Sequence, residues 1–287
     1  MDQLGRVGVW LGRIGRLSAD DERKAIAEVE RLGYPTLWVN ESYKEVFAHA
    51  GLALAASQRL VVATGIASIW SRRPAAMATG AQALGEAYPG RFVLGMGVSH
   101  PRFVKAYERP LAAMRDYLDE MDAATYLPPP ATPPVPRLIA ALRPKMLELA
   151  ATRAAGAHPY LVPVEHTAMA REALRSDAIL APEVAVVLDR DPSAARAAAR
   201  QYLDLYLGLP NYTNNLRALG FTDDDLADGG SNRLVDAIVA WGDEEAIRRR
   251  VQEHLDAGAD HVCIQPVPSG GAVGIDTLAE LAPALLV

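Results

Sequence analysis

The sequence predicts an α/β fold, a (β/α)8 TIM barrel with loop insertions. Short aliphatic and β-branched runs alternate with segments of helical apolar spacing, and most runs lack polar alternation, as expected for parallel strands covered on both faces. Their starts lie about 20 to 31 residues apart except for two longer gaps, close to the spacing of about 30 in an eight-unit barrel. The eight runs are residues 6–11, 36–39, 60–68, 91–97, 137–141, 158–162, 184–188 and 261–267.

An open, doubly wound sheet is the main alternative, because it has the same alternation of strands and helices. Such sheets more often have about five to seven strands and a glycine-rich first turn. The N-terminal glycines at positions 5, 8, 12 and 15 do not form the G-x-G-x-x-G pattern of that turn. At 287 residues the chain fits one large barrel, so we expect residues 1–287 to form a single domain.

Helix signals separate the predicted strands. Ser18 and Asp21 resemble an N-terminal capping box, and Gly33 supplies a C-terminal stop for the first helix. Proline suits the first position of a helix, because that position has no intrahelical N–H bond to lose. Three helices are therefore expected to begin at Pro74, Pro110 and Pro144. Two later helices are expected at residues 168–174 and 244–257.

The two longer gaps between strands are expected to hold loop insertions. One contains the proline-rich residues 128–136, and the other contains residues 211–230. Residues 210–216 are polar, aromatic and loop-like, which indicates a lid, a partner surface or an ordinary long connection.

Composition excludes several classes of protein. There are 29 basic and 35 acidic residues, a net charge of −6, so we expect no nucleic-acid partner. The single cysteine, Cys263, excludes an internal disulfide and lies in an apolar run, where a buried, inert thiol is expected. No apolar stretch approaches the ~18–20 residues of a membrane span, and the N-terminus has no signal-peptide core. We therefore expect a cytoplasmic protein with no membrane partner.

His100 is the most interesting titratable residue. The active site of a barrel lies at the carboxyl ends of its strands. His100 follows Gly95-Met96-Gly97, whose glycines would let a flat ligand approach the backbone. Its imidazole would take or give a proton near neutral pH. The alternative is an exposed rim histidine without a chemical role.

Asn40, Glu41 and Ser42 follow the second predicted strand. The carboxylate of Glu41 would lie at the same barrel mouth, or would stabilise the next helix by about 0.3–1 kcal/mol as an N-terminal acid. Asn40 and Ser42 can hydrogen-bond a planar heterocycle or cap that helix; we favour the capping interpretation from spacing alone.

Arg143 precedes Pro144 at a predicted helix start, where free amides and the helix dipole favour an anion. Its guanidinium would suit a ligand phosphate. Arg72 and Arg73 repeat this pattern before Pro74, and a solvated loop arginine is the alternative in each case. Zinc, cysteine-cluster, Walker and serine-hydrolase motifs are missing from the sequence, so no metal site is expected.

Eight segments carry a family resemblance over nearly the whole chain. They are residues 8–10, 36–41, 91–101, 144–150, 156–160, 165–167, 209–216 and 257–262. In this order they resemble the luciferase-like flavin and deazaflavin oxidoreductases, especially the actinobacterial group that uses coenzyme F-420.

The resemblance implies a TIM barrel, usually a homodimer, that binds a flavin-like ring and a small-molecule substrate at the strand ends. In such enzymes a non-prolyl cis peptide after the third strand supports the ring from behind, and the matching bond here joins Gly65 and Ile66. The cofactor-binding residues that the resemblance implies are Asn40, Ser42, Gly65, Ile66, Gly97, Val98, Ser99, Ala141, Leu142 and Arg143.

The chain departs from the family pattern in two places. Ser42 stands where the family has a proton-transferring histidine, and Leu142 and Arg143 replace glycines that usually approach the cofactor phosphate. His100 falls where related sugar-phosphate dehydrogenases carry a glutamate. The resemblance therefore implies His100 as the catalytic acid or base, Glu41 as a catalytic-site acid that contacts the cofactor or orients a neighbour, and Arg143 as the phosphate partner.

The implied reaction is a hydride transfer between coenzyme F-420 and an alcohol, aldehyde, imine or activated alkene. One alternative is an FMN-dependent monooxygenase on the same barrel. Another is a non-catalytic cofactor-binding protein, which the departures at Ser42, Leu142 and Arg143 make plausible.

Overall fold

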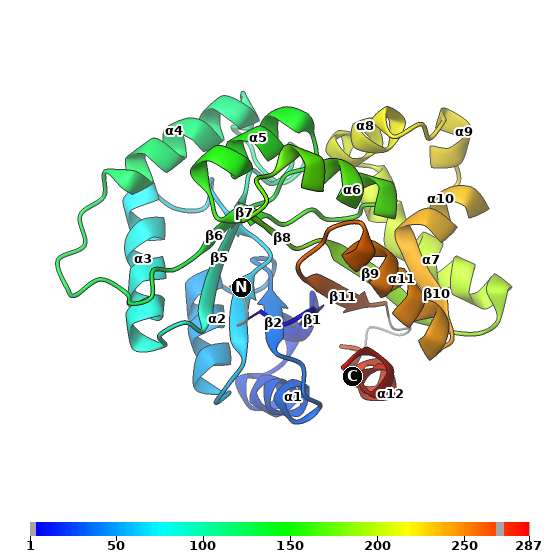
Figure 1. Cartoon of the computed structure of the whole chain (residues 1–287), viewed down its shortest axis with the longest axis horizontal. Coiled ribbons are helices and arrows are strands. Elements are labelled where there is room, and N and C mark those ends of the chain that lie inside the picture. The colour runs from blue at the N-terminus through cyan, green and yellow to red at the C-terminus, as the bar shows by residue number, and fades with distance from the viewer. Residues whose placement is uncertain (1–3, 268–272, 287) are drawn as a thin grey trace.

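The computed structural model describes residues 4–267 and 273–286, in which helices surround a curled parallel sheet (Figure 1). The strands are β1 (Val7–Trp10), β2 (Thr36–Val39), β3 (Val61–Thr64), β4 (Ala67–Ser68), β5 (Phe92–Gly97), β6 (Arg137–Ile139), β7 (Gly156–Ala157), β8 (Ile179–Leu180), β9 (Glu183–Leu188), β10 (Val239–Gly242) and β11 (Val262–Pro266). The helices are the 3-10 turn η1 (Ile14–Arg16), α1 (Ala19–Arg31), α2 (Val46–Ala55), α3 (Pro74–Ala87), α4 (Pro110–Asp122), α5 (Pro144–Arg153), α6 (Val164–Ala173), α7 (Pro192–Leu207), α8 (Pro210–Ala218), α9 (Asp223–Leu226), α10 (Asn232–Ile238), α11 (Glu244–Asp256) and α12 (Ile275–Leu285).

The sheet closes into a ring. β8 pairs with β7, β9 pairs with β11, and β11 pairs with β1, all in parallel. Only Ala181 and Pro182 separate β8 from β9, so these two strands are successive parts of one barrel strand. The members of the ring are then β1, β2, β3, β5, β6, β7, β8–β9 and β11. This arrangement confirms the predicted barrel and excludes the open sheet that was the main alternative.

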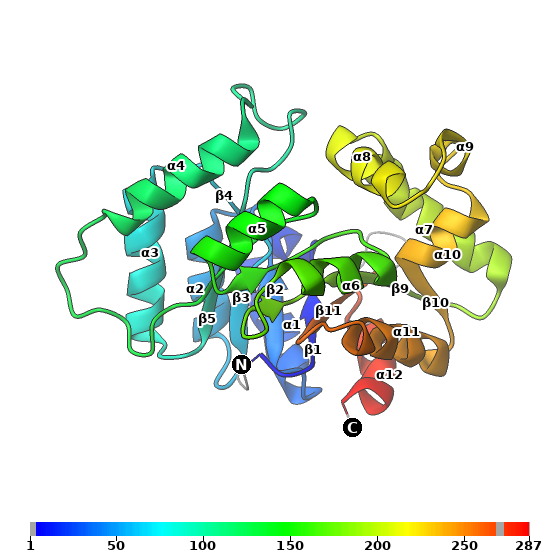
Figure 2. The ribbon, with the colours of Figure 1, turned by 45° about the horizontal axis from the view of Figure 1, so that its top comes forward.

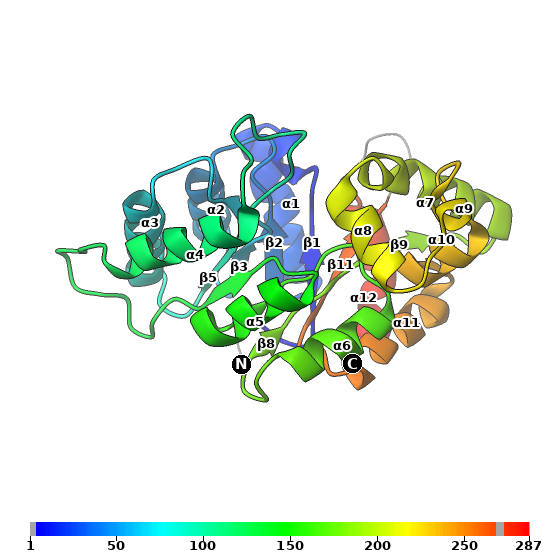
Figure 3. The same ribbon diagram turned by 90° about the horizontal axis from the view of Figure 1, so that it is seen from above.

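The second half of β9 has an additional neighbour, β10, which the sequence analysis did not predict. Val239 to Gly242 pair in parallel with Ala185 to Leu188. Helices α7, α8, α9 and α10, which lie between β9 and β10 in the chain, form a group on the side of the barrel away from α2, α3 and α4 (Figure 3). Much of the predicted insertion at residues 211–230 is therefore helical.

Several predicted boundaries are wrong. The strand expected at residues 158–162 is β7, which ends at Ala157, so the following residues belong to the strand-end loop. The strand expected at residues 60–68 is divided at Gly65 into β3 and β4. Helix α6 begins at Val164, four residues earlier than expected. Residues 210–216, expected to be a loop, lie in α8, which begins with a proline and buries one face.

Most local signals act as predicted. The Ser18 hydroxyl accepts a hydrogen bond from the Asp21 amide at 3.2 Å and caps α1. Proline is the first residue of α3, α4 and α5, and Asp243 caps α11. Within the described part of the chain, no helix combines the length and apolar character that crossing a bilayer requires.

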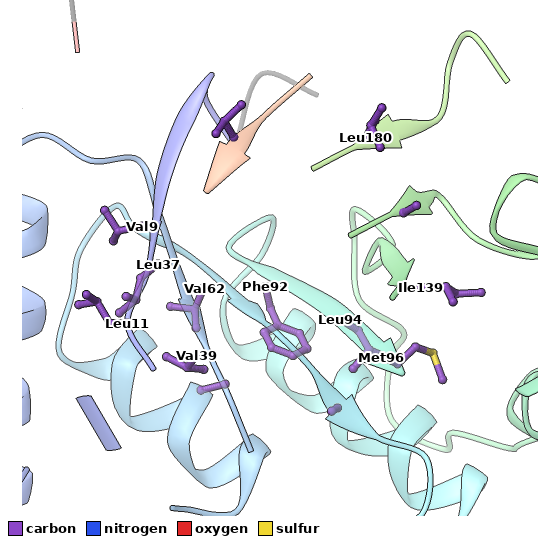
Figure 4. Close-up of a cluster of buried hydrophobic side chains, with 14 of the residues drawn as sticks. Val9, Leu11, Leu37, Val39, Val62, Phe92, Leu94, Met96, Ile139 and Leu180 are labelled. Carbon is purple, nitrogen blue, oxygen red and sulfur yellow. The ribbon is translucent and has the colours of Figure 1, made fainter. Parts of the chain in front are cut away.

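Apolar side chains alternate between two sides of the barrel wall. Those that face the helices include the Val9, Leu37, Val62 and Leu94 side chains shown in Figure 4. A separate interior cluster contains Trp10, Trp38, Val61, Ala63, Val93, Leu138, Ile179, Ala181 and Cys263. Cys263 is buried, as expected, and burial raises the pKa of its thiol, which disfavours the reactive thiolate.

The barrel interior is tightly filled by aromatic rings. The Trp38 indole stacks on His158, with ring centroids 4.2 Å apart, and donates a hydrogen bond to His261 Nε2 at 3.0 Å. The His261 ring in turn bonds the Gly5 carbonyl at 2.8 Å through Nδ1.

Strand β5 runs so close to β3 that a Cβ atom on Gly95 would lie 1.9 Å from the Thr64 carbonyl oxygen. Only glycine allows this approach.

Substitution of Gly95 should test this packing. We expect Gly95→Ala to lower the free energy of unfolding by at least about 1–3 kcal/mol, because the added methyl group must displace backbone. Urea denaturation measures the loss. Gly51→Ala is the matched control: its methyl group would lie 3.6 Å from Leu84, inside α2, where alanine is favoured over glycine by up to about 1 kcal/mol. Equal effects of the two substitutions would contradict the argument.

Candidate active site

A cavity of about 830 Å³ opens at the carboxyl ends of the strands. It is bounded by Trp10 at the end of β1, by the segments that follow β2, β3, β5, β6 and β7, and by residues of α4, α5, α7 and α8. Nearly all of the predicted site residues line it, namely Asn40, Glu41, Ser42, Gly65, Ile66, Val98, Ser99, His100, Ala141, Leu142 and Arg143.

Gly97 is the predicted site residue that is not part of the lining. It is buried behind the cavity wall, and a Cβ atom there would lie 3.0 Å from Ala140 Cβ and 3.2 Å from the Ile66 side chain. Its smallness therefore serves the packing of the residues that do face the cavity.

The Gly65–Ile66 peptide lies on the cavity wall and is cis, as the family resemblance implied. The Trp10 indole donates a hydrogen bond to the Gly65 carbonyl at 3.1 Å. A Cβ atom on residue 65 would lie 2.4 Å from the same indole nitrogen. Glycine at this position is thus required by the ring that fixes its carbonyl.

Glu41 forms an ion pair with Arg72. Its carboxylate binds both terminal nitrogens of Arg72 and accepts a hydrogen bond from the Ser68 amide at 2.7 Å. Arg72 also bonds Glu45 at 3.0 Å. Neither alternative for Arg72 holds: carboxylates of the protein already occupy its guanidinium, so it is not an anion site, and its side chain is only 10% exposed, so it is not a solvated loop arginine. Glu41 joins the loop after β2 to the segment that follows the cis peptide.

His100 lies in the half-buried segment after β5, in contact with aromatic rings. Its ring centroid is 5.0 Å from that of Tyr212 on α8 and 6.1 Å from that of Phe103. Burial lowers the pKa of His100 below its ordinary value of 6.5, so the imidazole is neutral near pH 7. A neutral imidazole can accept a proton from a bound molecule.

Three polar atoms of the cavity lining are buried without a hydrogen-bond partner among the residues that the structure describes. They are Asn40 Oδ1, His100 Nδ1 and His158 Nε2. His158 Nδ1 lies 2.7 Å from the Ala181 carbonyl and must donate to it, which leaves Nε2 as an acceptor. Burial lowers the pKa of His158 to about 4, so this ring is also neutral. Unpaired buried polar groups cost about 1–3 kcal/mol each, and a ligand with N–H or O–H groups would remove that cost.

Two cations mark another part of the cavity, at the start of α5. Arg143 is the N-cap residue and Lys145 lies in the first turn, both exposed and both in the lining. The preceding Leu142 carbonyl is held by His166 Nε2 at 2.7 Å. Cationic side chains beside free helix amides favour an anionic group.

The mouth of the cavity is apolar on both sides. Phe103, from the segment between β5 and α4, and Leu205, from α7, line the cavity and are 58% and 43% exposed. Figure 2 shows the segment between β5 and α4 at the same end of the molecule as α8. A ligand that enters between them meets apolar side chains before it reaches the polar atoms at the strand ends.

Sequence reasoning missed His158, Tyr160 and Lys145 as site residues. His158 and Tyr160 were placed inside a strand, whereas β7 ends at Ala157 and both follow it into the cavity. A strand end five residues earlier, at residue 157 instead of 162, would have found them. Lys145 could have been found from its place after Pro144 in the predicted first turn of a helix.

The chain was compared with known proteins. The model of the luciferase-like monooxygenase family matches residues 4–261. A protein of Mycobacterium tuberculosis named as a coenzyme F-420-dependent oxidoreductase is 24% identical over 344 aligned positions, which cover 96% of this chain and 98% of the relative.

Solved structures with the same fold bind different cofactors. An F-420-dependent secondary alcohol dehydrogenase, in complex with an F-420–acetone adduct, is similar with a TM-score of 0.76 and 17% identity, over 98% of each chain. The oxygenating component of 3,6-diketocamphane monooxygenase from Pseudomonas putida, in complex with FMN, is similar with a TM-score of 0.69 and 14% identity, over 98% of this chain and 99% of that one. At such identities the structural likeness shows the fold alone.

The ion pair between Glu41 and Arg72 should be measurable by a double-mutant cycle with Glu41→Gln and Arg72→Met. We expect a coupling energy of about 1–3 kcal/mol in urea denaturation, because the two side chains are only 15% and 10% exposed. Glu245 and Arg248 form the control pair; both are about half exposed, so their coupling should stay below about 0.5 kcal/mol. A coupling at Glu41 no larger than at the control pair would contradict the assignment.

Proposed function

The chain belongs to the luciferase-like monooxygenase family, and from this premise we propose that it is a single-domain oxidoreductase that transfers a hydride between coenzyme F-420 and a small organic substrate. The observation that carries the proposal is the group of polar atoms in the 830 Å³ cavity that have no hydrogen-bond partner among the described residues. The relative from Mycobacterium tuberculosis aligns over nearly its whole length and is named as an F-420-dependent oxidoreductase. This likeness favours the deazaflavin over FMN.

The cavity residues fit a flat ring with a phosphate-bearing tail. The cis peptide at Gly65 would support the ring from behind, with its carbonyl fixed by Trp10. Asn40 Oδ1 and His158 Nε2 are acceptors that ring N–H groups would satisfy. Arg143 and Lys145 would hold the phosphate at the start of α5; in this way charged side chains replace the backbone contact that glycines usually allow.

When bound, the deazaflavin accepts or delivers a hydride at a ring carbon. The protein has to place the substrate against that carbon and handle one proton. His100 is the group we assign to the substrate oxygen, because its Nδ1 is buried, unpaired among the described residues and neutral. Glu41 acts indirectly: through Arg72 and the Ser68 amide it fixes the wall beside the cis peptide. Phe103 and Leu205 at the mouth would limit the access of water.

Cofactor binding tests the proposal directly. Titration of the purified protein with coenzyme F-420, followed by cofactor fluorescence, should give a dissociation constant below tens of micromolar. The double variant Arg143→Ala/Lys145→Ala should bind about 10-fold more weakly or worse, because two charge-assisted phosphate contacts are lost. Arg249→Ala, an exposed arginine of α11, is the matched control and should bind normally. Binding of FMN without binding of F-420 would overturn the proposal in favour of an FMN enzyme.

Substitution of His100 tests the assigned proton transfer. His100→Ala should lower kcat by more than about 100-fold while F-420 binding changes little. Because burial places the pKa of His100 below 6.5, the imidazole becomes protonated only on the acid side. Wild-type activity should therefore fall as the pH drops below that range, and this acid limb should be missing in the variant. An unchanged kcat would exclude His100 as the acid or base. Undetectable turnover of the wild type with F-420 bound would instead support a non-catalytic binding protein.

A further inference from the structure

The part of the cavity formed by α7, α8 and the segment between β5 and α4 is here called the aromatic side. Every described residue that lines it is apolar, aromatic or uncharged and polar, since burial keeps the His100 imidazole neutral near pH 7. The charged residues of the described lining are Glu41, Arg143 and Lys145, which belong to other segments. A charged group bound on the aromatic side would therefore lose its water without gaining a partner.

Phe103 and Leu205 stand at the mouth of the aromatic side. They are two of the four large hydrophobic side chains that are exposed in the described part of the chain. The centroid of the His100 ring lies 6.1 Å from that of Phe103 and 5.0 Å from that of Tyr212. Apolar surface is stabilised when it leaves water, and aromatic rings favour a further ring in offset or edge-to-face contact. The group that best fits the space beside His100 is therefore an uncharged ring.

The hydrogens of two tyrosine hydroxyls follow from their partners. Tyr160 Oη lies 2.7 Å from Gln265 Oε1, and an amide oxygen can only accept, so Tyr160 donates its single hydrogen there. The 2.7 Å contact between the hydroxyls of Tyr160 and Tyr206 then uses the hydrogen of Tyr206. Burial raises the pKa of Tyr206 to about 12, so this hydrogen is present at neutral pH. Tyr206 can therefore offer a ligand in the cavity only a lone pair.

Tyr206 and His100 both contact the ring of Tyr212. The ring centroids of Tyr206 and Tyr212 are 5.5 Å apart, with their planes at 88°, and all three residues line the cavity. A ligand that bonds His100 at one end and Tyr206 at the other therefore extends past Tyr212. Such a ligand has a polar group at each end and an apolar part between them, as a para-substituted phenyl ring does.

We propose that the substrate is an uncharged alcohol, or the corresponding carbonyl compound, in which a ring joins the reacting carbon to a remote hydroxyl group. The reacting oxygen meets His100, the ring packs against Phe103 and Tyr212, and the remote hydroxyl donates a hydrogen bond to Tyr206. This inference rests on the proposed function and names its substrate class. Tyr206 is a specificity-determining residue, and the reaction moves no proton through it.

The oxidation of such an alcohol is balanced by the groups already assigned. The carbinol carbon gives up a hydride to the oxidised deazaflavin, and its hydroxyl gives up one proton to His100, which releases it to solvent. The carbonyl compound is the product, and the remote hydroxyl is unchanged. Reduction of the carbonyl compound reverses both transfers.

Four alcohols that differ only at the para position test the proposal. They are 4-hydroxybenzyl alcohol, benzyl alcohol, 4-methoxybenzyl alcohol and 4-(hydroxymethyl)benzoate. Titrations followed by ligand NMR, with the protein both free and loaded with F-420, should give the 4-hydroxy compound a dissociation constant about 3- to 10-fold below that of benzyl alcohol. The methoxy compound cannot donate and should bind no better than benzyl alcohol. The benzoate should not bind in the same concentration range.

Variants of the aromatic side test each contact. Tyr206→Phe removes the acceptor and should abolish the preference for the 4-hydroxy compound, while unchanged binding of benzyl alcohol shows that the variant is folded. Tyr34→Phe, which removes a hydroxyl bonded to the Leu278 carbonyl, should keep the preference. Phe103→Ala should weaken binding of the three uncharged alcohols by similar factors, about 2- to 10-fold. Leu127→Ala, at a side chain that is 92% exposed and outside the cavity lining, should not.

The outcomes separate this inference from the proposed function. Failure to bind F-420 would overturn the proposed function, and the affinities of the free protein would still decide the substrate class. Equal binding of 4-hydroxybenzyl alcohol and benzyl alcohol, or a preference that survives in Tyr206→Phe, would overturn the assignment of Tyr206. Unchanged affinities in Phe103→Ala would overturn the packing of the ring. Binding of the benzoate as tight as that of benzyl alcohol, or binding of none of the four compounds, would overturn the substrate class.

Discussion

The hydrogen bond from the Trp10 indole to the Gly65 carbonyl is the contact on which the geometry of the site depends. It joins the last residue of β1 to the residue that follows β3, and both residues line the cavity. The bond requires glycine at position 65, since any side chain would collide with the indole. Beneath it, Trp38 stacks on His158 and bonds His261, so the rings that fill the barrel also orient a polar group of the cavity.

The barrel and most of the cavity residues could be predicted from the sequence, because both depend on local signals. Buried parallel strands read as apolar runs, and the residues after each run must meet at one end of the ring. Asn40, Glu41 and His100 were found in this way. Part of what could not be predicted depends on pairing between distant residues. The ion pair joins Glu41 and Arg72, which are 31 positions apart in the sequence. The residues around Arg72 do not indicate whether its guanidinium is free or bound.

The two sides of the cavity have different chemical characters. Neutral nitrogen and oxygen acceptors and two exposed cations lie at the strand ends and at the start of α5. Phenol rings and apolar side chains come from α7, α8 and the segment after β5. A charged, hydrogen-bonding cofactor and an apolar substrate would each find a matching surface. Under the proposed function, this division would let the substrate side of the cavity change while the residues proposed to bind the cofactor stay the same.

The attachment of β10 to β9 has a consequence for how such a protein changes over evolutionary time. Helices α7, α8, α9 and α10 leave the ring after β9 and return through β10, which lies on that same strand. The ring itself is completed on the other edge of β9, which pairs with β11, and through β8, which pairs with β7. Insertion, deletion or recombination between Pro192 and Ile238 can therefore diversify one wall of the active site while the register of the barrel is conserved.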